Sequence, residues 1–229
     1  MRYKAVIFDM DGTILHTEHI WDQARKNLIA SRGIPLCEEL EQELAIQCAG
    51  RSMRECCTII KQAAQLSESV EELMHEKNTL ALSLYEQGVK FIDGFPEFHA
   101  HVTANNLVTG MATNANDQTV QIMNKALNLE KFFGRHMYTI SHTFNQPKPN
   151  PAVYLYAADQ LGVSPQECIA IEDSASGIQA AKDAGMLCIG INTSRRPELL
   201  VNAHHIINGY HELTLDALKD TLGNTLWTQ

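Results

Sequence analysis

The segment AVIFDMDGT, residues 5–13, is the strongest single indication of the fold of this 229-residue chain. Four apolar residues run directly into two carboxylates, Asp9 and Asp11, and Gly12 follows them. The apolar run is typical of a strand buried on both faces of a parallel sheet. Ligands of open α/β sheets bind outside the carboxyl ends of the strands. Because Gly12 allows the backbone to make a tight turn, both carboxylates are predicted to face one site. The alternative is that Asp9 or Asp11 only caps a turn.

Similar apolar runs recur along the chain and alternate with helix-like segments. Further strands are predicted at Leu107–Ala112, Met137–Ile140, Cys168–Ile171, Leu187–Ile191 and His205–Ile207. Helices are predicted at Asp117–Leu127, Pro151–Leu161, Ser174–Ala184 and Pro197–Asn202. Ser174 is a suitable N-cap, and Gly185 stands where a helix commonly ends. The alternation predicts an α/β fold with a doubly wound, mainly parallel, Rossmann-like sheet.

One region interrupts this alternation. Between His16 and Asp93 only amphipathic helical patterns occur, with leucines and isoleucines among Glu, Gln and Lys. A crossover between parallel strands needs only about a dozen residues, so the region is far longer than a connection. We therefore expect an inserted all-helical cap domain at residues 16–93 and an α/β catalytic core formed by residues 1–15 and 94–229.

Composition narrows the functional classes. A net charge of -9 argues against nucleic acid and anionic membranes as partners, because both attract a basic surface. No apolar run approaches the roughly 20 residues needed to cross a bilayer, and no secretory leader pattern precedes the first strand. The six cysteines form no C-x-x-C pair, which favours reduced thiols. We expect a cytoplasmic protein without nucleic-acid or membrane partners, and nothing in the sequence demands more than a monomer.

A second acidic group, Glu172-Asp173-Ser174, directly follows the predicted strand Cys168–Ile171. If the two acid-bearing strands are neighbours, these carboxylates share an edge with Asp9. Mg²⁺ prefers a few carboxylates together with carbonyl oxygens and waters, so Asp9 and Asp173 are candidate ligands. The alternative, in which Asp173 and Ser174 cap the following helix, is compatible with metal binding.

A cation and a hydroxyl complete the candidate site. Lys148 lies between Pro147 and Pro149, which fix its backbone, and its ammonium could hold a phosphoryl group. Thr113 and Asn114 lie between a predicted strand and a helix, where backbone N–H groups bind anions. Taken singly, Lys148 could belong to an exposed loop and Thr113 to an ordinary helix cap. Because all these groups follow strand ends, we predict one site for phosphoryl transfer.

The chain resembles the haloacid dehalogenase superfamily in four motifs that occur in order. These are D-x-D-G-T at residues 9–13, the threonine at 113, K-P-x-P at 148–151, and E-D-S at 172–174 before G-I-x-A-A-x-x-A-G. The helical insert resembles the cap of the β-phosphoglucomutase-like and phosphoglycolate phosphatase-like branch.

The resemblance implies roles by position. Asp9 would be the nucleophile that forms an aspartyl-phosphate, and Asp11 the general acid and later the general base. Mg²⁺ would be held by Asp9, the Asp11 carbonyl and Asp173, with Glu172 as an added or alternative ligand. Phosphate would be bound by Gly12, Thr113, Asn114 and Lys148. Asp11 favours phosphatases over dehalogenases, which lack a second aspartate there.

The cap and three departures bear on specificity. Gly50-Arg51-Ser52 resembles a cap motif that faces substrate, so Arg51 and Arg54 are candidate substrate-binding residues, with solvated surface charge as the alternative. Family members commonly carry other residues where this chain has His16, Asp93 and Pro147. These departures leave every catalytic group in place.

The expected function is Mg²⁺-dependent hydrolysis of the phosphate monoester of a small metabolite, such as a sugar phosphate. A sugar phosphomutase shares every core motif and is the main alternative. A phosphonatase would need a cap lysine that forms a Schiff base, and Lys61 and Lys77 are interpreted as ordinary helix-surface residues. A catalytically silent phosphate-binding protein is a further alternative.

Overall fold

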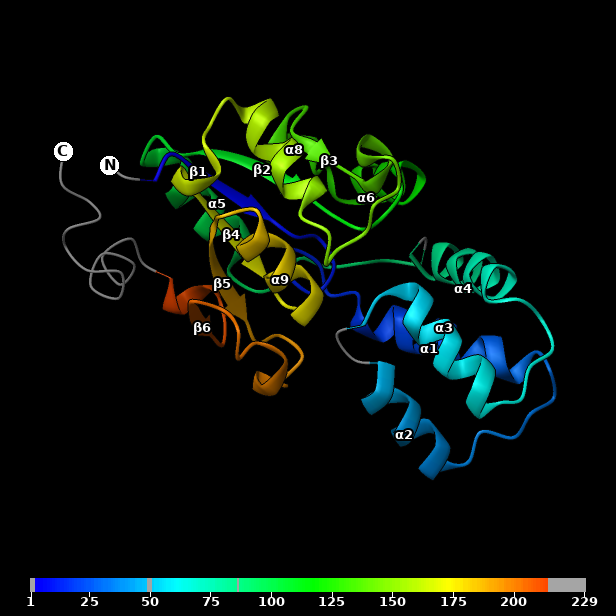
Figure 1. Cartoon of the computed structure of the whole chain (residues 1–229). Coiled ribbons are helices and arrows are strands. Elements are labelled where there is room, and N and C mark those ends of the chain that lie inside the picture. The colour runs from blue at the N-terminus through cyan, green and yellow to red at the C-terminus, as the bar shows by residue number, and fades with distance from the viewer. Residues whose placement is uncertain (1–2, 49–50, 86, 214–229) are drawn as a thin grey trace. The chain divides into compact units, whose positions relative to one another are not determined.

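The chain divides into two compact units, residues 1–16 with 90–229 and residues 17–89. The computed structural model describes residues 3–48, 51–85 and 87–213, and Figure 1 shows its elements. The sequence predicts an insert at residues 16–93, and the second unit of the structure spans residues 17–89. Each unit has its own core and is described separately.

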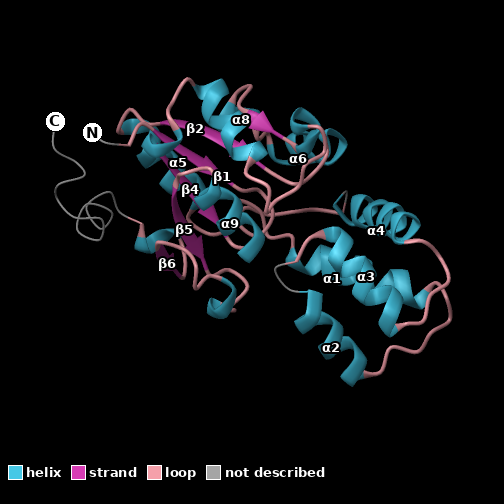
Figure 2. Ribbon diagram, in the orientation of Figure 1, coloured by secondary structure: helices cyan, strands magenta, loops and turns pink. Residues whose placement is uncertain are grey.

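The first unit contains a six-stranded sheet in which every pair is parallel, which confirms the predicted fold class (Figure 2). Its order is β3-β2-β1-β4-β5-β6. The strands are β1 (Ala5–Phe8), β2 (Val108–Ala112), β3 (Met137–Tyr138), β4 (Cys168–Glu172), β5 (Leu187–Ile191) and β6 (His205–Ile207). The strand order reverses direction between β1 and β4, and a reversal of this kind marks the binding crevice of doubly wound sheets.

Two predicted segments end earlier in the structure than in the sequence pattern. The strand predicted to reach Ile140 stops at Tyr138, because the Thr139 hydroxyl accepts from the Ser141 N–H and starts a 3₁₀ turn. The helix predicted at 197–202 is only a 3₁₀ turn, Pro197–Leu199. The chain must leave that turn at once to enter β6 at His205.

Five helices of the first unit surround the sheet among the described residues. They are α5 (Phe95–Ala104), α6 (Asp117–Leu127), α7 (Glu130–Phe133), α8 (Ala152–Leu161) and α9 (Ala175–Asp183). The other described helical segments of this unit are 3₁₀ turns at Ile140–Thr143, Pro165–Glu167, Pro197–Leu199 and Tyr210–Glu212. Ser174 caps α9, as predicted, by accepting from the Gly177 N–H.

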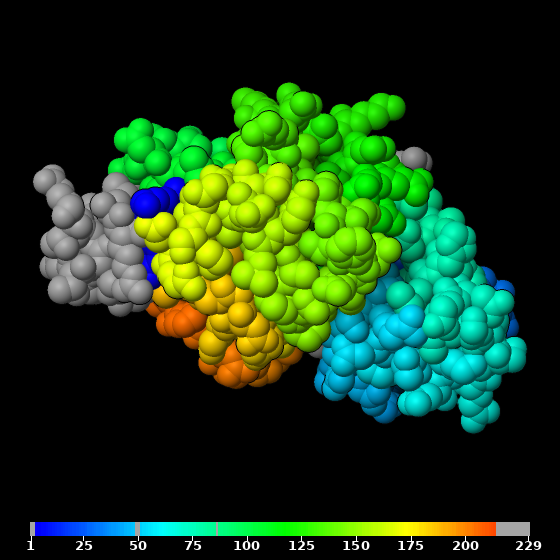
Figure 3. Space-filling view, turned by 45° about the horizontal axis from the view of Figure 1, so that its top comes forward, coloured from blue at the N-terminus to red at the C-terminus, as the bar shows by residue number. Residues whose placement is uncertain are grey.

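The alternation of side chains along β1 divides the core into two layers. Ala5 and Ile7 belong to an apolar cluster with residues of α8 and α9, and the segment carrying both helices fills the front of the space-filling view in yellow-green and yellow (Figure 3). Phe8 faces the other way and meets the rings of Phe95 and Phe133, at 5.5 and 5.9 Å between centroids. The sheet is therefore buried on both faces, as its continuous apolar runs require.

The second unit is all-helical among its described residues. It consists of α1 (Glu18–Ala30), α2 (Glu38–Cys48), α3 (Met53–Ala63) and α4 (Val70–Tyr85). A capping box fixes the start of α3: Ser52 and Glu55 bond each other's backbone N–H. The core of the unit is made of Leu28, Ile29, Leu44, Cys57, Ile60, Leu66 and Leu73.

The interpretation of Lys77 as an ordinary surface residue is wrong. Lys77 is buried and its ammonium lies 5.6 Å from the centre of the Trp21 ring. It is buried because Leu73, Lys77 and Ala81 follow one another at four-residue spacing on the inner face of α4. Lys61 donates to the carbonyl oxygens of Leu66 and Ser67, at 3.1 and 3.2 Å. Both ammonium groups thus have structural partners.

Two segments pair where the chain leaves and re-enters the first unit. Leu15 forms an antiparallel bridge with Phe91, and the His16 N–H donates to the Lys90 carbonyl. The residues that leave and re-enter the core therefore run side by side. In the part of the chain described here, no helix has the length and apolar character that crossing a membrane demands.

Candidate active site

The two acidic groups meet because β1 and β4 are hydrogen-bonded neighbours. Phe8 is in register with Ile171, and the Asp9 N–H donates to the Ile171 carbonyl at 3.0 Å. Asp9 and Glu172 therefore leave adjacent strands at the same level. Both residues lie where the strand order of the sheet reverses. The sequence analysis predicts a shared site on the condition that these two strands are neighbours, and they are.

Lys148 joins the ends of three strands. Its side chain is only 2% exposed, and its ammonium donates to Asp9 Oδ1 at 2.5 Å and to Glu172 Oε1 at 2.6 Å. A third bond, of 2.9 Å, goes to the Ala112 carbonyl at the end of β2. A lysine ammonium has three donors, so these acceptors satisfy it completely. The reading of Lys148 as an exposed loop residue is therefore wrong.

The polar group after β2 positions this lysine. The side-chain oxygen of Asn114 accepts from the Lys148 backbone N–H at 2.8 Å. Thr113 is buried, and its hydroxyl oxygen accepts from the Ala115 N–H at 3.0 Å. Helix α6 is capped by Asn116 and not by Thr113, so the ordinary-cap reading does not account for Thr113. Phosphate binding by Thr113 and Asn114 stays a prediction.

Glu172 is fully buried and has partners beyond Lys148. Its Oε1 accepts from the Tyr154 hydroxyl at 2.8 Å, and its Oε2 accepts from the Ser174 hydroxyl at 3.1 Å. The centre of the Tyr154 ring also lies 4.7 Å from the Lys148 ammonium. Sequence reasoning missed Tyr154: the spacing of Val153, Tyr154 and Ala157 marks a core-facing side chain, but nothing local shows where its hydroxyl points.

Burial dominates the electrostatics of these groups. It raises the pKa of Asp9 to about 8, against the opposing charge of Lys148 and with added repulsion from Glu172 and Asp11. Burial lowers the pKa of Lys148, but Asp9 and Glu172 together raise it above its ordinary value, so the ammonium stays charged. The pKa of Tyr154 lies well above its usual range, chiefly through burial and then through Glu172 and Asp9. Its hydroxyl therefore remains a donor.

Gly12 leaves room for Asp173. Its φ is +74°, and a Cβ there would come within 1.9 Å of Asp173 Oδ2. The Thr193 hydroxyl donates to the Gly12 carbonyl at 2.6 Å and holds this turn. Glycine is thus needed both for the backbone conformation and for the approach of the carboxylate. Sequence reasoning did not select Thr193.

The carboxylates fit a divalent cation. Asp9, Glu172 and Asp173 each offer an oxygen, and these oxygens lie within 4.8 Å of one another. Lys148 pairs with Asp9 and Glu172, and Asp173 adds a third carboxylate close to these two, so negative charge is left to be neutralised. Oxygen donors are those that Mg²⁺ selects. Asp11, also predicted as a ligand, is partly exposed in the turn after β1.

The predicted specificity residues lie elsewhere in the chain. Arg51 and Arg54 are exposed on the helical unit and pair with Glu55 at 3.8 Å and Glu71 at 2.7 Å. Gly50 of the same motif lies outside the described residues. His16 and Asp93 are exposed, and the Pro147 carbonyl accepts from the Asn150 N–H. Substrate binding by the two arginines stays a prediction.

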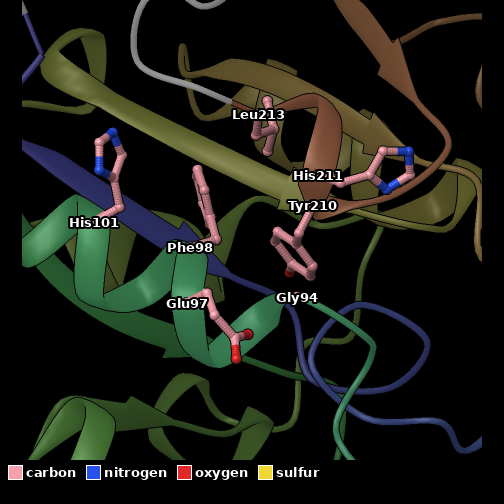
Figure 4. A pocket seen from close by; sticks show the side chains of 7 residues that line it. All are labelled: Gly94, Glu97, Phe98, His101, Tyr210, His211 and Leu213. Carbon is pink, nitrogen blue, oxygen red and sulfur yellow. The ribbon is translucent and has the colours of Figure 1, made fainter.

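A pocket of about 450 Å³ lies between α5 and the 3₁₀ turn Tyr210–Glu212 (Figure 4). Its lining residues are Gly94, Glu97, Phe98, His101, Tyr210, His211 and Leu213. It holds none of the carboxylates around Lys148. The Tyr210 hydroxyl instead donates to the Thr13 carbonyl at 3.0 Å and thereby stabilises the turn after β1.

This geometry can be set beside known proteins. The family model described as haloacid dehalogenase-like hydrolase matches residues 6–191, from β1 to the end of β5. The chain belongs to the haloacid dehalogenase-like hydrolase family. The matched region contains Asp9, Lys148 and Glu172, which the structure brings together.

Relatives of this haloacid dehalogenase-like hydrolase span most of its length. A phosphorylated carbohydrates phosphatase from Thermotoga maritima is 28% identical over 80% of this chain and 82% of its own. A beta-phosphoglucomutase from Bacillus subtilis is 28% identical over 95% of this chain and 94% of its own. The crystal structure of a HAD hydrolase, family IA, variant 3, from Entamoeba histolytica matches with a TM-score of 0.82 and 28% identity, covering 96% and 99% of the two chains. The family match identifies the protein as an enzyme of a hydrolase family.

Proposed function

We propose that this enzyme is a Mg²⁺-dependent phosphatase that hydrolyses the monoester of a small phosphorylated carbohydrate. The observation that carries the proposal is the buried ammonium of Lys148, which bridges Asp9 and Glu172 where β1 and β4 end. A carboxylate held next to a fixed cation can attack a phosphorus atom and keep a defined orientation while charge moves.

In the first step, the Asp9 oxygen not bonded to Lys148 attacks the phosphorus atom in line with the sugar oxygen. The bond from phosphorus to the sugar oxygen breaks, and Asp11 gives its proton to that oxygen. The products are a free sugar and an aspartyl-phosphate on Asp9. Lys148 balances the negative charge of the transferred group, and the Thr113 hydroxyl is assigned to one of its oxygens.

In the second step, the Asp11 carboxylate takes a proton from a water molecule, which attacks the same phosphorus atom. The bond from phosphorus to Asp9 breaks, inorganic phosphate leaves, and Asp11 is again protonated. Asp9, Asp173, Glu172 and the Asp11 carbonyl are assigned to Mg²⁺, which when bound supplies positive charge that offsets the phosphoryl oxygens. That charge also favours the ionised form of Asp9, which burial alone disfavours.

The test is phosphate release from a panel of phosphorylated sugars and other metabolites, with Mg²⁺ or EDTA. The variant Asp9→Asn keeps the shape of the nucleophile and removes its charge, while Asp159→Asn makes the same change at an exposed position on α8. We expect Mg²⁺-dependent release that vanishes in Asp9→Asn and persists in Asp159→Asn. Phosphate release that is unchanged by EDTA and by Asp9→Asn would overturn the proposal. The absence of phosphate release from every ester would favour a catalytically silent phosphate-binding protein.

A phosphomutase is the second candidate, because a beta-phosphoglucomutase is similar over 95% of this chain. It would use the same Asp9 chemistry but return the phosphoryl group to another hydroxyl of the sugar. Incubation with glucose 1-phosphate separates the two activities. Free phosphate in step with substrate loss supports the phosphatase, whereas isomerised sugar phosphate without free phosphate supports the mutase.

The compartment belongs to the same proposal. All six cysteines are free thiols in the structure, and reduced thiols are typical of the cytoplasm. We therefore propose a cytoplasmic enzyme whose partner is its small phosphorylated substrate.

A further inference from the structure

Three of the six cysteines gather where α2 ends and α3 begins. They are Cys48, at the last position of α2, and Cys56 and Cys57, in the first turns of α3. Cys57 is fully buried and belongs to the apolar core of the helical unit, as packing alone would explain. Cys48 and Cys56 show contacts that packing does not require.

These two residues bond each other reciprocally. The Cys56 thiol donates to the Cys48 carbonyl at 3.2 Å, and the Cys48 thiol lies 3.9 Å from the Cys56 carbonyl. Each thiol thus lies against the backbone of the other cysteine, and a disulfide between two cysteines requires such proximity.

The surroundings make one of the two thiols reactive. The neighbouring Cys56 thiol lowers the pKa of Cys48 to about 7, against the opposing effect of burial. The positive charges of Lys77, Arg25 and Arg51 act in the same direction. The pKa of Cys56 is raised by the neighbouring Cys48 and by burial. Cys48 is only half-buried, whereas Cys56 is 6% exposed, so the more acidic thiol is also the one a reagent can reach.

We propose that Cys48 and Cys56 are an oxidation site, at which a hydroperoxide converts the two thiols into a reversible disulfide. The Cys48 thiolate attacks the outer oxygen of the peroxide, the O–O bond breaks, and water or an alcohol leaves after taking a proton. Cys48 is then a sulfenic acid, oxidised by two electrons. The Cys56 sulfur attacks the Cys48 sulfur, the S–OH bond breaks, and a second water leaves with the Cys56 proton. A thiol reductant returns both residues to the starting state.

The structure separates this pair from the other cysteines. Cys57 adjoins Cys56 in sequence but lies in the apolar core. Cys37 is exposed, outside the ordered helices, and is the natural comparison for a solvent-accessible thiol. Cys168 and Cys188 are buried in strands of the other unit.

The test uses the full chain, fully reduced and then treated with hydrogen peroxide. Free thiols are blocked by alkylation, and the protein is digested with trypsin without reduction. Cleavage after Arg51 and Arg54 separates the peptide 33–51 from the peptide 55–61. We expect the two peptides to be joined through Cys48 and Cys56, with Cys37 and Cys57 alkylated. Their joint mass should be two hydrogens less than the sum of the two peptides that each carry one alkyl group, and dithiothreitol should separate them.

Four single variants assign the link. Cys48→Ser and Cys56→Ser are expected to abolish it, whereas Cys37→Ser and Cys57→Ser are expected to retain it. In Cys56→Ser, a dimedone-type probe should trap sulfenic acid at Cys48, because the resolving thiol is gone. The far-ultraviolet circular dichroism spectrum of each variant shows whether its helices are intact.

The wild-type protein alone can overturn the proposal. If peroxide leaves the peptides 33–51 and 55–61 unjoined while Cys37 is oxidised, Cys48 and Cys56 are packing residues. A link that survives in Cys56→Ser or disappears in Cys57→Ser would assign the bond to the wrong partner and reject the pair. None of these outcomes depends on phosphatase activity, so the inference and the proposed function can fail separately.

Discussion

Removing the Tyr154 hydroxyl tests whether the buried charges around Lys148 are held by the contacts described above. Tyr154→Phe deletes one oxygen and keeps the ring, whose centre lies 4.7 Å from the Lys148 ammonium. Glu172 loses the 2.8 Å bond to its Oε1 but keeps Lys148 and Ser174. The change therefore removes one hydrogen-bond donor from a buried carboxylate that has no access to solvent.

The magnitude follows from the kind of bond that is lost. A hydrogen bond to a charged group contributes about 1.5–3 kcal/mol to stability. Because Glu172 is fully buried, no solvent replaces the lost donor, and we expect the free energy of unfolding to fall within that range. If the Lys148 ammonium also shifts away from Asp9, kcat falls by up to about tenfold for each 1.4 kcal/mol lost from the transition state, with KM little changed.

Urea denaturation, followed by circular dichroism, measures the loss of stability, and phosphate release under saturating substrate measures kcat. Tyr156→Phe is the matched control, since Tyr156 lies on the same helix and packs its ring against Tyr138 and His142. We expect the control to change stability by less than about 0.5 kcal/mol. Equal, small effects of the two variants on stability and on kcat would refute the view that Tyr154 fixes Glu172 and Lys148.

Two further predictions concern other buried contacts. Gly177→Ala places a Cβ within about 2 Å of the Glu172 carboxyl group, so denaturation should show that the free energy of unfolding falls by roughly 1–3 kcal/mol. Helix propensity alone would raise the free energy of unfolding. A rise would therefore contradict the packing described for α9. Burial lowers the pKa of His99 from 6.5, so its contribution to stability is complete above about pH 6.5 and is lost as the pH falls, by at most about 1.4 kcal/mol per pH unit. Denaturation curves between pH 7 and 5 should show a smaller loss for His99→Gln than for wild type, and identical losses would rule His99 out as the cause.

Much of the fold was predictable because the relevant signals are local. Continuous apolar runs such as Ala5–Phe8 and Cys168–Ile171 identified strands of a parallel sheet, and Ser174 and Gly185 marked the ends of a helix. The acidic pairs at strand ends, Asp9 with Asp11 and Glu172 with Asp173, pointed to the site. Each of these signals is carried by side-chain polarity at a fixed spacing, which a single sequence contains.

The strand order and the partners of each charge are decided by pairing between distant segments. Lys148 and Asp9 are 139 residues apart, and nothing local states that the ammonium is buried between two carboxylates. For the same reason Tyr154, Thr193 and Lys77 were missed or misjudged: each has a polar tip whose partner comes from another element. Local polarity identified the strand ends that carry Asp9 and Asp173 to within a residue, although the strand predicted to reach Ile140 stops at Tyr138. That β1 lies beside β4 is visible in the tertiary structure alone, because strand pairing brings together backbone groups that no local pattern connects.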